Sequence, residues 1–244
     1  MVGFLENLVF RHRIAILIAI GAITAVMGYF AAQLRMDAGF EKQLRRDHEY
    51  IQTFLEYQDR LFGSNRVIFV LRAKQGEVWT QPFLAKLKEL TDDVFFLPGV
   101  DRRTVTSIWT PNTRYFEITE EGLIADDVIS ADVLATRMNG EDIEVIRRNV
   151  IKGGFVGRLV AKDYTAAMVT ADLLEVDPKT EEKLDYLELA RRIETEIRAR
   201  HESEEFDVHI LGFVTMMGQI AEGAKSAFWF FGLAFILTAA AVYY

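Results

Sequence analysis

Two uncharged apolar segments lie near the ends of the chain, and a long charged segment separates them. The first runs from Ile14 to Leu34 and the second from Ser226 to Tyr244, and neither contains Asp, Glu, Lys or Arg. Both are close to the roughly 20 residues that a helix needs to cross a hydrocarbon layer of about 30 Å. The pattern therefore predicts two membrane spans. Because no polar residue closes the second, we expect the chain to be the N-terminal portion of a larger membrane protein.

The 191 residues between the two segments hold 26 Lys and Arg and 35 Asp and Glu. A loop this long and charged predicts a folded, water-exposed domain on one side of the membrane. Its negative balance argues against nucleic acid as a partner, because no field of Lys and Arg is present to neutralise phosphates. The chain has no cysteine, which excludes disulfides, thiolate metal sites and cysteine nucleophiles.

The first apolar segment is open to a second interpretation, as a cleaved signal peptide, because Arg11 and Arg13 precede it. It is longer than the usual apolar region of about 7–15 residues, and the small-residue cleavage pattern is missing before Ala31 and Ala32. We therefore expect it to be retained as an anchor. Basic residues flank it on both sides, so charge alone does not set its orientation.

Hydrophobic periodicity in the middle of the chain predicts alternating strands and helices. The run Val67 to Leu71 is apolar on both faces, as in a central strand. Thr80 and Pro82 are typical of a helix start, and Pro98-Gly99 of its end. The expected elements, in order, are a helix over 50–62, a strand over 66–73, a helix from Thr80 to Pro98, a strand over 105–109, helices over 130–138 and 141–151, a hairpin of 158–161 and 165–174, a helix over 182–200 and a strand over 208–211.

Without the irregular stretch 111–154, the order is strand-helix-strand followed by strand-helix-strand. This order predicts the α+β class and the ferredoxin-like, or split βαβ, plan, with an insertion at about 111–154 and two helices on one face of the sheet. The expected organisation is an N-terminal segment 1–13, a span 14–34, a linker with an amphipathic helix 35–65, the α+β domain 66–212, a linker 213–225 and a truncated second span 226–244.

Local sequence adds a resemblance to this plan. The stretches that carry it are Met36 to Phe40, Arg46 to His48, Phe62 to Val67, Thr106 to Asn112, Gly157 to Val160 and Asp163 to Ala167. Together with the topology, they resemble the resistance-nodulation-division (RND) superfamily of exporters, and within it the MMPL-type predicted lipid exporters. That family places a porter domain between its first and second spans, on the non-cytoplasmic side.

The resemblance implies a proton-driven, multi-pass exporter of lipid-like or other hydrophobic substrates in the bacterial inner membrane, with this domain in the periplasm and the N-terminus in the cytoplasm. Its implied partners are membrane lipid, the hydrophobic substrate, the remaining spans and a second porter domain. A homo-oligomer or an accessory periplasmic protein is a further implied partner. The family's proton-relay acids lie in later spans, and the uncharged segments here cannot relay protons.

Candidate site residues lie where the domain meets the second apolar segment. The stretch Phe213 to Ile220 is apolar, and its methionines suit irregular apolar ligands. The candidates for a substrate path are Phe213, Met216, Met217, Ile220 and Trp229, with packing in a core or linker as the alternative. The expected anchors at the membrane interface are Arg11, Arg13, Phe228, Trp229, Phe230 and Phe231. If this stretch is a linker, aspartate at Met216 and Met217 should leave the domain folded.

No arrangement of residues in the sequence is typical of catalysis. The four histidines are not spaced as metal ligands, and adjacent carboxylates diverge from one another. We therefore expect no enzymatic activity, no cofactor and no metal. The alternative function is a two-span extracytoplasmic ligand sensor or adaptor, which would continue into a cytoplasmic module. An exporter would instead continue into further spans and a second copy of the domain.

Overall fold

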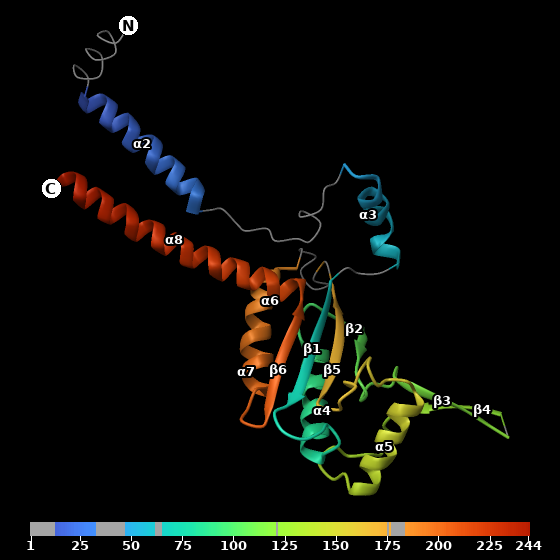
Figure 1. The fold of residues 1–244 in the computed structure, drawn as a ribbon. Helices are drawn as coiled ribbons and strands as arrows, with labels where there is room; N and C mark the ends of the chain where they lie inside the picture. Colours follow the sequence, from blue (N-terminus) through green and yellow to red (C-terminus); the bar gives the residue numbers. More distant parts are fainter. Residues whose placement is uncertain (1–12, 33–46, 62–64, 121, 175, 177–183) are drawn as a thin grey trace. The chain divides into compact units, whose positions relative to one another are not determined.

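The computed structural model describes residues 13–32, 47–61, 65–120, 122–174, 176 and 184–244 (Figure 1). The chain divides into two compact units, residues 1–37 and 38–244. The first unit contains α2 (Arg13–Ala32). The elements of the second unit are α3 (Glu49–Leu61), β1 (Arg66–Ala73), α4 (Gln81–Phe96), β2 (Val100–Thr106), β3 (Arg114–Thr119), β4 (Gly122–Asp127), α5 (Gly140–Lys152), β5 (Ala166–Leu173), α6 (Tyr186–Arg192), η2 (Ile193–Arg198), α7 (Ala199–His201), β6 (Phe206–Gly212) and α8 (Phe213–Tyr243).

A four-stranded antiparallel sheet with the order β2-β5-β1-β6 forms the centre of the second unit. Strand β1 lies between β5 and β6, and Val70 is opposite Met168 on one side and His209 on the other. Strand β2 pairs with the far edge of β5. The predicted strand over 66–73 matches β1, and the predicted α+β class is confirmed as a mixed fold with an antiparallel sheet.

The two faces of this sheet are buried to different degrees. On one face, Val67, Phe69 and Leu71 of β1 are fully buried. Helix α4 covers this face, beginning at Thr80, whose hydroxyl accepts a hydrogen bond from the Phe83 amide at 3.4 Å. The alternate side chains of β1 point to the other face, on which no helix lies among the described residues. Figure 1 looks onto that face, with α4 behind the sheet.

The second helix on the buried face is continuous from Tyr186 to His201 and has three parts, α6, a π-helical segment η2, and α7. Ile193 and Ile197 of the π-helical segment are buried, and this segment contacts both α4 and β6. The helix predicted over 182–200 is thus present from Tyr186 onward, while residues 182 and 183 lie outside the described residues.

The stretch 111–154 is more regular than its sequence indicates. Strands β3 and β4 form a hairpin, and α5 matches the helix predicted over 141–151. The helix predicted over 130–138 is wrong, because this stretch forms turns. Its backbone bonds are isolated turns, in which the Val133 amide donates to the Ser130 carbonyl and the Arg137 amide donates to the Leu134 carbonyl. Asn139 then accepts from the Asp142 amide while Asp142 accepts from the Asn139 amide. That capping box requires an extended backbone at Asn139, so the helix begins only at Gly140.

Two other predicted strand positions are displaced. The strand predicted over 105–109 lies earlier, as β2, and residues 107–113 form turns. In those turns the hydroxyls of Thr110 and Thr113 donate to the Ser107 carbonyl at 2.8 and 2.7 Å, and such local bonds compete with strand pairing. The predicted hairpin arm 158–161 is not a full strand, since its ladder contact is a single bridge between Val160 and Ala167.

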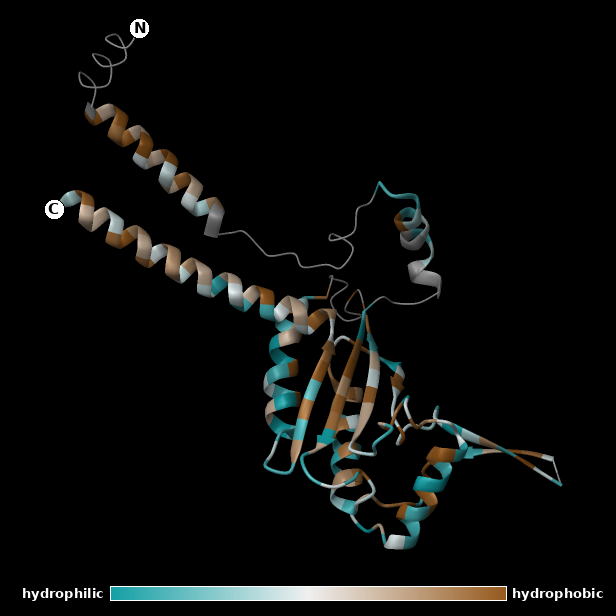
Figure 2. Ribbon diagram, in the orientation of Figure 1, coloured by the Kyte–Doolittle hydropathy of each residue, from teal (hydrophilic) through white to brown (hydrophobic). Residues whose placement is uncertain are grey.

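Helix α8 is 31 residues long and joins the predicted linker 213–225 and the predicted span 226–244 without a break. Among the described residues it is the one helix that is long and apolar enough to cross a membrane. The apolar part of α2, Ile14–Phe30, is shorter. Figure 2 shows hydrophobic residues along most of α8 and hydrophilic residues over α6.

Candidate functional site

The junction of β6 with α8 is built around Gly212. Its φ of +154° lies in a region that residues with a side chain rarely adopt, and a Cβ there would stand 2.9 Å from the Arg66 carbonyl oxygen of β1. The Gly212 carbonyl accepts a hydrogen bond from the Thr215 hydroxyl at 2.8 Å, within the first turn of α8. The strand therefore passes directly into the helix, with no loop between them.

The first two turns of α8 pack onto the domain. Val214 and Met217 are buried, and the Phe213 ring meets the Tyr186 ring edge to face at a centroid distance of 5.9 Å. Gly218 lies so close to α6 that a Cβ there would stand 2.7 Å from the Ala190 Cβ. Absence of a side chain at Gly218 thus permits close contact between the two helices, which fixes the start of α8 on the domain.

The five candidates for a substrate path do not share one environment. Met217 is only 4% exposed and is part of the packing between α8 and the domain, whereas Met216 is 46% exposed. Ile220 and Trp229 are also exposed. The structure therefore separates two neighbouring methionines that the sequence placed in one role.

The expected interface anchors divide between described and undescribed residues. Phe228, Trp229, Phe230 and Phe231 are all exposed on α8, as an aromatic group at a membrane interface would be. Arg13 is the first residue of α2, and Arg11 lies outside the described residues. The anchoring role of these six residues stays a prediction.

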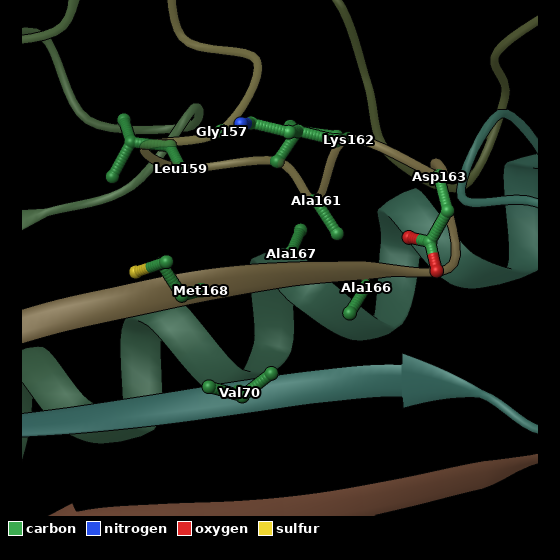
Figure 3. Close-up of a pocket in the computed structure, with 10 residues that line it drawn as sticks. Val70, Gly157, Leu159, Ala161, Lys162, Asp163, Ala166, Ala167 and Met168 are labelled. Atoms are coloured by element: carbon green, nitrogen blue, oxygen red, sulfur yellow. The ribbon is translucent and has the colours of Figure 1, made fainter.

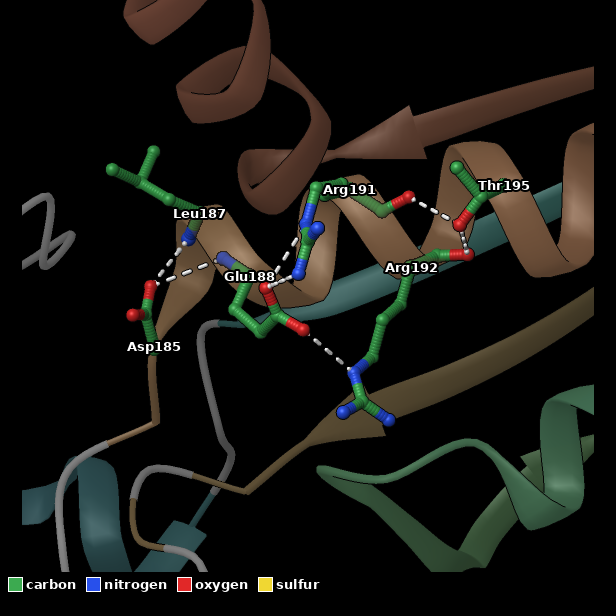
Figure 4. A network of polar contacts seen from close by, with 6 residues as sticks. All are labelled: Asp185, Leu187, Glu188, Arg191, Arg192 and Thr195. Carbon is green, nitrogen blue, oxygen red and sulfur yellow. Dashed lines mark hydrogen bonds and ion pairs between the residues drawn. The ribbon is translucent and has the colours of Figure 1, made fainter.

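Local polar contacts order the first turns of α6, the helix on which α8 packs (Figure 4). Asp185 caps the helix by accepting from the amides of Leu187 and Glu188 at 3.0 and 3.1 Å. Glu188 accepts from the guanidinium groups of Arg191 and Arg192, which holds the pKa of Glu188 below its usual range. Because these groups are exposed, their effect is to order the first turns of α6 more than to stabilise the fold.

A buried histidine, which the sequence did not mark as special, joins the two helices on the covered face of the sheet. His201 of α7 has no exposed surface, and its Nε2 lies 2.7 Å from the Asp93 carboxylate of α4. Asp93 also accepts from Arg200 at 3.0 Å. Nε2 therefore carries the hydrogen, and Nδ1 is left buried with no hydrogen-bond partner among the described residues.

Burial lowers the pKa of His201, and the nearby cations Lys86 and Arg200 lower it further, while Asp93 acts in the opposite direction. The unfolded chain therefore takes up a proton at this residue before the folded chain does as the pH falls. The contribution of His201 to the stability of the domain is therefore complete above pH 6.5 and decreases as the pH falls below that value.

We expect His201→Gln to reduce this pH dependence, because an amide donates to Asp93 and does not titrate. One proton contributes at most about 1.4 kcal/mol per pH unit. Thermal unfolding of both proteins between pH 7.5 and 5.5 measures the difference, and equal slopes for wild type and variant would contradict the assignment. The residues Lys86, Asp93 and Arg200 remain in both proteins, so position 201 is the only difference between them.

The described residues contain no group of three His, Asp or Glu side chains that could hold a metal ion. His201 is buried against α4, whereas His209 is exposed on the uncovered face of the sheet. The part of the chain that the structure describes therefore offers a packed junction and a buried histidine that is hydrogen-bonded to Asp93. Comparison with known family models and with curated proteins finds no match to this chain.

Proposed function

We propose that this chain is the N-terminal part of a proton-driven RND or MMPL-type exporter of lipid-like or other hydrophobic substrates. The observation that carries the proposal is the direct passage of β6 into α8. Through Gly212, an α+β domain is joined without a loop to a helix that is long and apolar enough to cross a membrane. A porter domain that moves with a membrane helix needs such a connection.

The sheet topology supports the same proposal. In the split βαβ plan, the first strand lies between the third and the fourth, and the second strand lies outside the third. With β1, β2, β5 and β6 as those four strands, the order β2-β5-β1-β6 has this arrangement, and every pair is antiparallel. The hairpin β3–β4 and helix α5 are then an insertion between the second and third strands. On this basis we assign the domain to the ferredoxin-like plan.

In this proposal the domain stands in the periplasm, the N-terminus is cytoplasmic, and the protein is a multi-pass protein of the inner membrane. Energy coupling resides in further spans, because α8 and the apolar part of α2 carry no acid that could relay protons in their apolar stretches. The remaining spans and a second porter domain complete the pathway, and no catalytic step is required of this chain.

The proposed topology predicts which single cysteines react with a membrane-impermeant maleimide in intact cells. Residues 1–244 contain no cysteine, so each variant has one reactive position once any cysteines in the rest of the complete protein are replaced with serine. We expect Glu120→Cys, in the turn of the β3–β4 hairpin, to be labelled from outside, and Val2→Cys to be labelled only after the membrane is permeabilised. The opposite pattern would place the domain in the cytoplasm and remove the exporter proposal.

Transport itself is tested in cells that express the complete gene. Efflux of a hydrophobic dye should depend on the gene and should stop when a protonophore collapses the proton gradient. The sensor alternative predicts no efflux under any condition and a cytoplasmic module encoded after the second span. The two functions therefore differ both in the assay and in the gene.

A further inference from the structure

The uncovered face of the central sheet is hollowed near the start of β5 (Figure 3). A groove of about 490 Å³ lies there, within the range of roughly 300–1,000 Å³ that ligand sites occupy. Val70 of β1, together with Ala166 and Met168 of β5, forms its floor, and the segment 157–163 forms its wall. The lining is mostly apolar, and the groove is separate from the junction of β6 with α8.

The wall of the groove is held in place by backbone hydrogen bonds. The Met168 amide donates to the Leu159 carbonyl at 2.9 Å, and the Ala161 amide donates to the Ala166 carbonyl at 2.8 Å. The groove is therefore formed before any ligand binds. These bonds, with the pairing of β1 to β5 and β6, also use the backbone groups of the floor, so an extended peptide would find no free sheet edge there.

Lys162 is the basic residue among those that line the groove. The stem of Lys162 lies along Gly157, where a Cβ would stand 3.2 Å from the Lys162 Cε, and the φ of +81° at Gly157 also favours glycine. Lys162 is exposed, and no hydrogen bond or ion pair of its ammonium group occurs within the described residues. The adjacent carboxylate of Asp163 is different, because it accepts from the amide and the hydroxyl of Thr165 at 3.2 and 3.0 Å.

We propose that this groove binds a long-chain carboxylate, with the acyl chain on the apolar floor and the carboxylate at the Lys162 ammonium group. An acyl chain needs no hydrogen bonds, which suits a floor whose backbone groups are already paired. A carboxylate complements the ammonium group of Lys162, which is the basic residue among those that line the groove. The inference concerns binding alone and stands whether or not the chain is part of an exporter.

The test uses the full chain in phosphatidylcholine vesicles and a long-chain fatty acid that carries a photoreactive diazirine. After illumination, mass spectrometry locates the label. We expect labelled peptides that contain Val70 or Met168, and competition by an excess of unlabelled fatty acid. A label confined to α8 and α2 would show partition into the bilayer only and would overturn the proposal.

Two lysine variants test the role of charge. Lys162→Gln should reduce labelling of the groove by the fatty acid by about threefold, the effect of losing one solvent-exposed charge pair. It should leave labelling by the methyl ester of the same probe unchanged. Lys88→Gln is the matched control, because Lys88 lies on α4, on the other face of the sheet, and pairs with Asp92. An equal response of both variants, or an equal loss for acid and ester, would contradict the assignment of the carboxylate to Lys162.

Failure of this proposal is distinguishable from failure of the exporter proposal. Groove labelling without proton-dependent efflux would support the binding site and contradict transport. Proton-dependent efflux without groove labelling would support the exporter proposal and contradict the binding site. Circular dichroism of each variant establishes that it is folded, and Lys162 is exposed, so its substitution removes no core contact.

Discussion

Replacing Gly212 with alanine should lower the free energy of unfolding of the α+β domain by about 3 kcal/mol. A residue with a side chain is strained at a φ of +154°, and the added Cβ would lie 2.9 Å from the Arg66 carbonyl oxygen and 3.2 Å from the Val67 Cα. Both contacts are with backbone of the central strand β1, which cannot rotate away. Thermal unfolding in detergent should show a midpoint lower by about 10 °C.

Gly223→Ala is the control for this substitution. Gly223 lies in the same helix that Gly212 precedes, and a Cβ there meets no atom within 4 Å. Alanine should be neutral or slightly favourable at that position, because it costs less backbone entropy in a helix than glycine does. Similar midpoints for Gly212→Ala and wild type would show that the junction adapts and that β1 does not constrain it.

The second large effect is expected at Met217. Met217→Asp places a carboxylate at a position that is 4% exposed, between α8 and the domain. A buried charge without a partner destabilises a fold by several kcal/mol, and we expect about 4 kcal/mol here. The same measurement of thermal unfolding tests it, with near-ultraviolet circular dichroism to follow the Tyr186 and Phe213 rings at this interface.

Met216→Asp provides the neighbouring control. The Met216 side chain is 46% exposed, so an aspartate there stays hydrated. The free energy of unfolding should therefore change by no more than about 0.5 kcal/mol. The two exposures therefore predict a destabilised domain for aspartate at both methionines, with the loss arising at Met217. If Met216→Asp alone impairs efflux in the complete exporter, the substrate path includes this exposed side, and normal efflux would exclude it.

Elements with strong local signals were predictable from sequence. The apolar run Val67 to Leu71 lies in the central strand because both of its faces suit burial or half-burial. Thr80 caps the next helix through a side-chain hydrogen bond, and the fixed backbone of Pro82 suits the first helical turn. The order of these elements was sufficient for the α+β class. The hairpin β3–β4 was missed because its strands have exposed apolar residues on a two-stranded ribbon, with no buried face to give a clear alternation.

The sites were less predictable than the fold. Nothing in the sequence around His201 indicates burial, because its partner Asp93 is 108 residues away. Lys162 lies between the two predicted arms of a hairpin, 158–161 and 165–174, and the groove beside it depends on how the segment 157–163 pairs with β5. Met216 and Met217 differ in exposure because successive residues of a helix point in directions about 100° apart. The apolar character of the whole stretch 213–220 does not show which of the two faces the domain.

The length of α8 has a mechanical consequence. Its 31 residues extend over roughly 46 Å at 1.5 Å per residue, whereas a hydrocarbon layer is about 30 Å thick. A bilayer would therefore enclose about two thirds of the helix and leave the remaining third in water, where α6 packs against the first turns of α8. The helix is continuous from the domain into its apolar part, with no loop between the two. Any tilt of its membrane part would swing the sheet and its groove as one body, in proportion to their distance from the bilayer.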